Sequence, residues 1–217
     1  MSRLINIMPM AGLGKRFSNL NYKNPKPLIK INNTPMFIEA SKSMPKADLN
    51  IYICNENILN SKKVKDKLHK FGIKNYSIIS TSENTNGQAS TCLLAKDLIR
   101  DDDIIFIHSC DSFIQFDNIK FLKQIKKNDV IVFTTKPTES HLTNINSYGW
   151  VHFNIDKINK ITCKIAASKN PENDHIIVGS FAFRNKYFFL KSINSIIENK
   201  IKINNEYYLD VAINEAL

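Results

Sequence analysis

The sequence predicts an α/β protein with a doubly wound, mainly parallel sheet and an inserted β-ribbon in its second half. Apolar runs of strand length alternate with helical patterns up to about residue 135, which is typical of a parallel sheet covered by helices. After Lys136 this alternation stops, and closely spaced short strands predict a hairpin. The chain has 217 residues, 43% hydrophobic and 23% charged, so it can bury a core without disulfides.

The first half contains apolar runs that we expect to form the strands of this sheet. They are Leu4–Met10, Leu49–Cys54, Tyr76–Ser80, Ile104–His108 and Val130–Thr135.

Helices are expected between these strands. Thr34 is predicted to be an N-cap with Pro35 as the first helical residue, in a helix that ends near Met44. The spacing of Val64, Leu68 and Phe71 places them on one face of the next helix. Two further helices are predicted, at about Gln88–Ile99 and Asn118–Lys127.

The second half is predicted to add a hairpin, a strand and two helices. The hairpin pairs Trp150–Asn154 with Ile161–Ile165 across a turn at Asp156–Lys160. The strand is Ile176–Phe183, and the helices lie near Asn185–Glu198 and Tyr207–Ala216. We therefore expect a single domain over residues 1–217, with one half at about 1–135 and the other at about 136–217.

Charge and cysteine content limit the function classes. The net charge is +10, but only four of the 30 basic residues are Arg, the usual reader of nucleic acids. We interpret the scattered lysines as solvated surface, so no nucleic acid or membrane partner is expected. The four cysteines have neither zinc nor disulfide spacing, and no apolar run is long enough for a signal peptide or a membrane span. The expected location is the cytoplasm.

The first strand runs directly into a glycine-rich, basic loop. Gly12 and Gly14 let backbone N–H groups approach an anion closely, and Lys15 and Arg16 can reach along a polyphosphate. The loop matches neither a Walker loop nor a dinucleotide fingerprint, where a third glycine would replace Phe17. An ordinary strand–helix turn is the alternative interpretation of this loop alone.

Two charged side chains support the hypothesis that this loop binds a polyphosphate. Lys26 stands between Pro25 and Pro27, which predicts an extended, stiff segment. Asp111 follows the strand Ile104–His108, at the edge where open α/β sheets bind ligands. A carboxylate there suits Mg²⁺ beside a triphosphate, although a loop or N-cap aspartate would occupy the same position.

Further motifs follow in order along the chain. They are Asn86-Gly87-Gln88-Ala89, Tyr148-Gly149-Trp150-Val151, Val178-Gly179-Ser180-Phe181 and Glu206-Tyr207-Tyr208-Leu209-Asp210-Val211. Together with the loop, Lys26 and Asp111, they resemble the nucleotidyltransferase superfamily that makes nucleotide-activated sugars and alcohols. The resemblance spans roughly residues 4–214 and implies the family's Rossmann-like fold, with the β-ribbon in the acceptor-binding lobe.

The resemblance also implies roles for individual residues. The implied nucleotide-binding residues are Met10, Ala11, Gly12, Gly14, Lys15, Arg16, Ser82, Gly87 and Gln88. The implied catalytic residues are Arg16, Lys26, Asp111 and Asp210, of which Asp111 and Asp210 would bind Mg²⁺. The implied acceptor-binding residues are Tyr148, Gly149, Lys169, Gly179 and Glu206.

The departures from the family pattern bear on the substrate. Sugar-nucleotide members carry Glu-Lys-Pro where this chain has Ser168-Lys169-Asn170-Pro171, so an acceptor other than a sugar, such as a phosphorylated alcohol or amino-acid derivative, is open. The short stretch after Asp210 resembles phosphocholine-type cytidylyltransferases and implies CTP as donor. The opening Met8-Pro9-Met10-Ala11-Gly12 resembles a subgroup from bacterial capsule and surface-polysaccharide pathways. The alternatives are a uridylyl- or thymidylyltransferase for a sugar 1-phosphate, and a non-catalytic phosphate-ligand or nucleic-acid binder.

Overall fold

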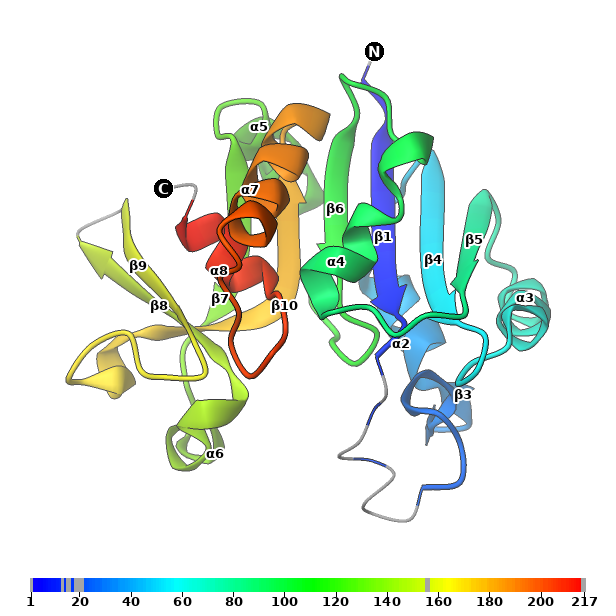
Figure 1. Cartoon of the computed structure of the whole chain (residues 1–217), viewed down its shortest axis with the longest axis horizontal. Helices are drawn as coiled ribbons and strands as arrows, with labels where there is room; N and C mark the ends of the chain where they lie inside the picture. The colour runs from blue at the N-terminus through cyan, green and yellow to red at the C-terminus, as the bar shows by residue number, and fades with distance from the viewer. Residues whose placement is uncertain (1, 13, 15–16, 18–21, 155–156, 216–217) are drawn as a thin grey trace.

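One mixed sheet forms the centre of the molecule in the computed structural model, which describes residues 2–12, 14, 17, 22–154 and 157–215 (Figure 1). Its strands follow the order β5-β4-β1-β6-β10-β8-β9, and β7 pairs with β10. The bounds are β1 Leu4–Met10, β4 Leu49–Asn55, β5 Tyr76–Thr81, β6 Ile104–His108, β7 Val130–Thr135, β8 Gly149–Asn154, β9 Lys157–Cys163 and β10 His175–Phe183.

The direction of the strands confirms the predicted fold class. The pairs β1–β4, β4–β5 and β1–β6 are parallel, whereas β10 is antiparallel to both β6 and β7. Five strands therefore point the same way, and β10 runs between two of them in the opposite direction. The other end of β10 pairs with β8, so the β8–β9 hairpin continues the same sheet. The division of the chain into two halves stays a prediction.

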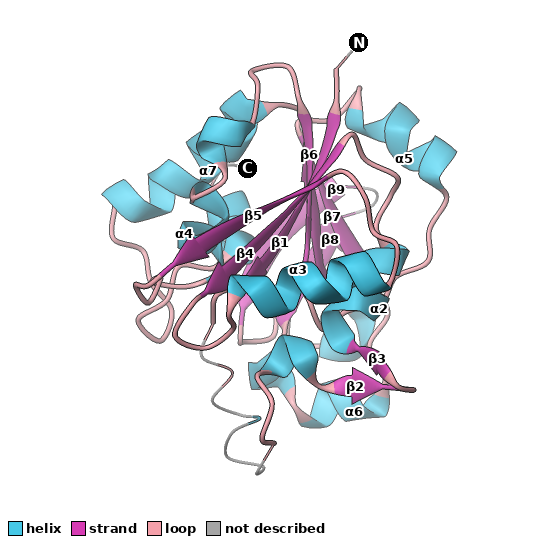
Figure 2. Cartoon of the chain, turned by 90° about the vertical axis from the view of Figure 1, so that its right-hand side faces the viewer, coloured by secondary structure: helices cyan, strands magenta, loops and turns pink. Residues whose placement is uncertain are grey.

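Helices cover both faces of the sheet (Figure 2). On one face α4 (Gln88–Leu93), α7 (Lys186–Glu198) and α8 (Leu209–Asn214) pack on the apolar side chains that the strands point toward them. On the other face lie α2 (Met36–Ser43), α3 (Ser61–Lys70) and α5 (Asn118–Ile125). The remaining elements are short: η1 (Lys26–Leu28), β2 (Lys30–Ile31), β3 (Thr34–Pro35), η2 (Lys96–Leu98), α6 (Glu139–Thr143), η3 (Ile145–Ser147) and η4 (Pro171–Asn173).

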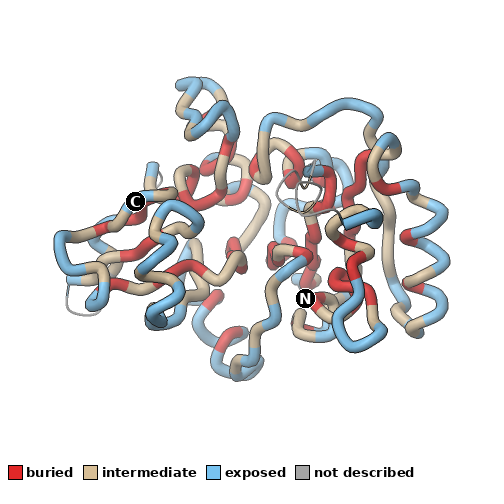
Figure 3. Tube along the Cα trace, turned by 90° about the horizontal axis from the view of Figure 1, so that it is seen from below, coloured by how far each residue is buried: buried red, intermediate tan, exposed pale blue. Residues whose placement is uncertain are grey.

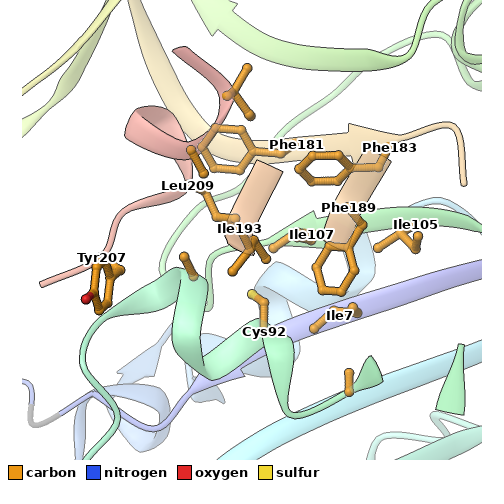
Figure 4. Packing of buried hydrophobic residues seen from close by; sticks show 14 of the residues in the cluster. Ile7, Cys92, Ile105, Ile107, Phe181, Phe183, Phe189, Ile193, Tyr207 and Leu209 are labelled. Carbon is orange, nitrogen blue, oxygen red and sulfur yellow. The ribbon is translucent and has the colours of Figure 1, made fainter. Parts of the chain in front are cut away.

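Alternation along the strands explains this two-sided core, because successive side chains of a strand point to opposite faces. Ile5 and Ile7 of β1 belong to the α4–α7–α8 cluster, whereas Met8 packs with α2 and α3. Figure 4 shows the first cluster, with Cys92 of α4 facing the strands, and Figure 3 shows that buried segments occupy the interior. Each fully buried side chain of this kind contributes about 1.5–3 kcal/mol.

Several predicted boundaries are wrong. Thr34 and Pro35 form β3 rather than a helix start, so α2 begins at Met36 without a side-chain cap. The helix expected over Gln88–Ile99 is interrupted, because α4 ends at Leu93 and a 3-10 turn follows.

The second half also differs in its details. The second hairpin strand starts at Lys157 and ends at Cys163, so the turn is shorter than predicted. The last helix begins at Leu209 rather than at Tyr207. No described helix is long and apolar enough to cross a membrane.

Candidate active site

A first cavity lies at the carboxyl ends of β1 and β6, which run parallel and therefore end at the same edge of the sheet. Its volume is 630 Å³. The lining comes from the loop after β1, η1, the start of α4, the segment after β6 and the turn before α8. Its residues include Met10, Ala11, Gly12, Gly14, Lys26, Asn84, Thr85, Gly87, Gln88, Ser109, Asp111, Lys164, Glu206 and Tyr208.

A lysine–aspartate pair crosses the first cavity. Lys26 Nζ lies 2.5 Å from Asp111 Oδ2 and 5.6 Å from the centroid of the Phe17 ring. Both charged groups are partly exposed, so the pair adds little to stability and both remain accessible to a ligand. Lys26 is not extended as predicted, because it is the first residue of the 3-10 helix η1, of which Pro25 is the N-cap.

The start of α4 is fixed against the segment before α8. Gly87 is the N-cap of α4 with φ 107° and ψ 178°, a conformation open essentially only to glycine. A Cβ atom there would lie 2.6 Å from both the backbone N and O of Tyr207. The Tyr207 N–H donates to Asn86 O at 2.7 Å, and the Ala89 N–H donates to Tyr207 O at 3.0 Å. This close packing joins two parts of the cavity wall that are distant in sequence.

A second cavity of 710 Å³ adjoins the first. Six residues line both: Phe17, Gln88, Ser109, Asp111, Ser147 and Tyr208. The lining of the second cavity also includes Phe113, Thr135, His141, Asn144, Tyr148, Gly149, Ile176, Ile177, Gly179, Phe181 and Asp210. A ligand can therefore span both cavities across Asp111.

Asp210 is a buried carboxylate in the second cavity. It is 8% exposed, and burial raises its pKa to about 6. The Cys163 thiol and the Val211 N–H offer hydrogen bonds to it, which lower the pKa. A Cβ atom on Gly149 would lie 2.6 Å from Asp210 Oδ2, so only glycine leaves this carboxylate room. A buried acid that is costly to ionise alone is well suited to a bound cation.

A second lysine lies beside the place where the two cavities meet. Lys164 Nζ is 4.8 Å from the centroid of the Tyr208 ring, and the Tyr208 hydroxyl donates to Glu206 Oε2 at 2.5 Å. The Lys164 backbone has φ 61°, and its N–H donates to Tyr148 O at 2.9 Å. These contacts hold Lys164 at the first cavity.

The end of β6 is held by a buried histidine. His108 Nδ1 lies 2.7 Å from Ser180 Oγ on β10, and Nε2 lies 3.0 Å from Ser112 O. Burial lowers the His108 pKa to about 4, while the Ser112 carbonyl and the Asp111 charge act in the opposite direction. The ring is therefore neutral near pH 7 and fixes the segment that carries Asp111.

The structure brings most of the predicted site residues together. The first cavity contains Met10, Ala11, Gly12, Gly14, Lys26, Gly87, Gln88, Asp111 and Glu206, and the second contains Tyr148, Gly149, Gly179 and Asp210 in addition to Gln88 and Asp111. Two predicted residues line neither cavity: Ser82 and Lys169 are both exposed, on separate loops. Lys15 and Arg16 lie outside the described residues.

Sequence reasoning missed several residues that line the cavities, notably Lys164, Phe113, His141 and Asn144. Lys164 follows β9 directly, but the sequence predicted a strand that continues to Ile165, so it gave no signal for this residue. The others carry no motif: Phe113 lies on the segment after β6, and the positions of His141 and Asn144 depend on how the segment between β7 and β8 folds.

Basic and acidic groups thus face the same space, in which phosphate oxygens and a cation could be held together. Among the described residues, no group of three or more His, Cys, Asp or Glu side chains could hold a metal by itself. Asp111 and Asp210 both line the second cavity. The fold is that of an α/β protein with two adjoining cavities that share Asp111.

The comparison with family models identifies the family. The model described as nucleotidyl transferase matches residues 6–210, nearly the whole chain, so the chain belongs to this family and is a nucleotidyltransferase. None of the curated proteins matches the chain.

Solved structures share the fold at low sequence identity. The nucleoside-diphosphate-sugar pyrophosphorylase of Vibrio cholerae RC9 has a TM-score of 0.77 at 19% identity, covering 97% of this chain and 86% of its own. The inositol-1-phosphate CTP transferase of T. maritima has a TM-score of 0.73 at 14% identity, covering 99% and 81%. A UDP-glucose pyrophosphorylase complexed with UDP-glucose has a TM-score of 0.73 at 18% identity, covering 100% and 87%.

Proposed function

We propose that this chain is a Mg²⁺-dependent enzyme that joins the nucleoside monophosphate of CTP to a phosphorylated small molecule and releases pyrophosphate. Its product would be an activated precursor for capsule or other surface-glycan synthesis. The observation that carries the proposal is the meeting of the two cavities at Asp111, with Lys26 on one side and Asp210 on the other. The first cavity would take the nucleotide and the second the acceptor.

The reaction needs positioning and charge neutralisation more than proton transfer. A phosphomonoester is largely dianionic near pH 7, so its oxygen can attack the α-phosphorus without a general base. The new P–O bond forms as the bond between the α-phosphorus and the bridging oxygen breaks, and pyrophosphate leaves with the electron pair. Lys26 would stabilise negative charge on the α-phosphate, and Gly12, Gly14 and Arg16 would hold the β- and γ-phosphates.

The residues present fit a magnesium ion. Mg²⁺ is usually bound by one or two carboxylates together with substrate phosphates, and Asp111 and Asp210 line the same cavity. The raised pKa of Asp210 supports this assignment, since burial without a cation disfavours its charge. When bound, the ion would neutralise phosphate charge, and Asp111 and Asp210 would hold it.

We assign the acceptor phosphate to Lys164. The sequence predicts Lys169 for this role, but Lys169 is exposed on the loop after the hairpin. Lys164 lies at the first cavity, beside Tyr208, which lines both cavities. Its ammonium group can therefore reach the boundary between donor and acceptor.

The choice of CTP is supported by the likeness to an inositol-1-phosphate CTP transferase. The alternative donor is UTP or dTTP with a sugar 1-phosphate as acceptor. The likeness to a UDP-glucose pyrophosphorylase complexed with UDP-glucose supports that alternative.

A thermal-shift panel tests the donor. CTP, UTP, dTTP, ATP and GTP are each added with and without Mg²⁺. A ligand at 100 times its Kd stabilises by about 2.7 kcal/mol, which is a shift of several degrees for this length. We expect CTP with Mg²⁺ to give the largest shift. A larger shift with UTP or dTTP selects the alternative donor. The proposal is refuted if, in a separate turnover assay, none of these nucleotides reacts with any acceptor.

A further inference from the structure

The second cavity has an unusual charge distribution for a site that takes an anionic acceptor. Among the described residues that line it, Asp111 and Asp210 are the charged side chains that face the candidate metal, and neither a lysine nor an arginine is present. The rest of the lining is aromatic, aliphatic, hydroxyl or amide, apart from one histidine. The described part of this lining therefore offers no counter-ion for a second acidic group on the acceptor.

The histidine is His141, and its hydrogen bonds fix its tautomer. His141 lies in the first turn of α6, and its Nδ1 accepts from the Thr138 backbone N–H at 2.9 Å. The Thr138 hydroxyl lies 2.8 Å from the same nitrogen, and the Thr138 side chain also accepts from the His141 backbone N–H, which completes a capping box. Since Nδ1 accepts a hydrogen bond from a backbone N–H, the proton of the neutral ring lies on Nε2.

Two further observations keep this proton available to a ligand. The His141 ring packs edge-on against Tyr148, with centroids 4.8 Å apart, so its orientation is set on two sides. Within the part of the chain that the structure describes, no protein group bonds to Nε2. His141 thus brings a fixed hydrogen-bond donor to the second cavity.

Asn144, three residues further on, brings the complementary acceptor. Its Nδ2 donates to Ser140 O at 3.0 Å and lies 3.1 Å from Thr143 Oγ1. Both amide hydrogens are thereby used within the loop, and Oδ1 is the atom left for a ligand. Asn144 lines the same cavity as His141.

We infer that His141 and Asn144 select the acceptor, by binding a neutral group that both accepts and donates a hydrogen bond, a hydroxyl or a carboxamide. This inference rests on the proposed transferase function. His141 Nε2–H donates to the oxygen of that group, and Asn144 Oδ1 accepts its hydrogen.

Other acceptor chemistries match this pair poorly. A carboxylate has no hydrogen to give Asn144, and no described lysine or arginine of the cavity neutralises it. A quaternary ammonium group forms no hydrogen bond with either residue, so neither His141 nor Asn144 would contribute a hydrogen bond to its binding. The pair therefore distinguishes acceptors of similar size by their polar groups.

The first part of the test is an acceptor panel with the wild-type chain, Mg²⁺ and the preferred nucleotide, followed by pyrophosphate release. The probes are a hydroxylated acceptor (glycerol 3-phosphate or glucose 1-phosphate), a phosphorylated hydroxy-carboxamide, phosphocholine and O-phosphoserine. We expect turnover with the hydroxylated or the carboxamide probe. The faster of the two identifies which of these groups the acceptor carries. Preference for phosphocholine or O-phosphoserine overturns the inference.

The second part compares His141→Glu with His141→Gln. Both side chains keep an oxygen for the helix cap, since Glu and Gln are the usual residues at this position of a capping box. Only Gln retains an N–H to donate. We expect kcat/KM for the acceptor to be about three- to tenfold lower in the Glu variant than in the Gln variant, with KM for the nucleotide unchanged in both.

The outcomes separate the two proposals. Equal acceptor kinetics in the Glu and Gln variants, or an effect on the nucleotide KM alone, overturn the role of His141 while leaving the transferase function in place. Absence of pyrophosphate with every nucleotide and acceptor overturns the proposed function, and the inference with it.

Discussion

Replacing Gly87 by alanine should separate the cavity wall from the start of α4. Its φ of 107° and ψ of 178° cost a non-glycine residue about 2 kcal/mol. The added Cβ would lie 2.6 Å from the N and O atoms of Tyr207, so Tyr207 must move. That movement breaks two backbone hydrogen bonds, worth together about 2 kcal/mol. The expected loss in the free energy of unfolding is about 4 kcal/mol.

Gly72→Ala is the matched control. Gly72 also has a positive φ, 70°, but a Cβ atom there would meet nothing within 4 Å. The loss should therefore be only the backbone strain, about 1–2 kcal/mol. Urea unfolding of both variants measures the difference, provided that the slopes with denaturant agree.

The nucleotide response adds a functional readout. Gly72→Ala should keep the full thermal shift with the preferred nucleotide and Mg²⁺, because it lies after α3. Gly87→Ala should lose most of this shift, since the wall of the first cavity formed by the start of α4 and the segment before α8 is displaced. Equal losses of stability in the two variants would refute the reasoning, as would an intact nucleotide shift in Gly87→Ala.

Three further predictions concern individual side chains. Lys164→Ala should lower kcat/KM for the acceptor by about 10²-fold in a steady-state assay, whereas Lys169→Ala should stay close to wild type. The reverse order would show that Lys169, not Lys164, binds the acceptor phosphate. Gly149→Ala should abolish most Mg²⁺-dependent turnover with little change in circular dichroism, because its Cβ would displace the Asp210 carboxylate; full activity would exclude that contact. His108 has a folded pKa of about 4 against 6.5 unfolded, so its contribution is complete above pH 6.5 and falls by about 3 kcal/mol as pH drops to 4. Urea unfolding from pH 7 to 4 should show a shallower loss for His108→Gln than for wild type, and parallel curves would contradict the assignment.

The sheet could be predicted from the sequence because its strands are short apolar runs. Leu4–Met10, Ile104–His108 and Val130–Thr135 have the predicted bounds. The first two are buried on both faces, which explains their nearly continuous apolar runs, whereas Val130–Thr135 is only half-buried. Thr34 and Pro35 show the limit of local signals. They suit a helix start, but pairing with Lys30 and Ile31 makes them a strand.

Which residues line the cavities could be predicted where their place follows from sequence motifs, and could not be predicted where it depends on packing. Gly87 and Asp111 stand at strand or helix ends, so their place at the sheet edge follows from the order of elements. Which lysine faces the cavity depends on where the hairpin strand ends, one residue before Lys164, and that end was predicted two residues too late. The role inferred for His141 depends on its contacts with Thr138 and Tyr148, which no spacing in the sequence indicates.

The most direct measurement of nucleotidyl transfer is ³¹P NMR of the chain with the preferred nucleotide, Mg²⁺ and an acceptor that supports turnover. The account predicts that the three triphosphate resonances decline while pyrophosphate and a pair of coupled diphosphate-diester resonances grow in equal amounts. The Asp111→Asn variant should show neither at a comparable rate. Growth of nucleoside diphosphate and inorganic phosphate in place of these products would show hydrolysis and contradict transfer, as would unchanged triphosphate with every acceptor.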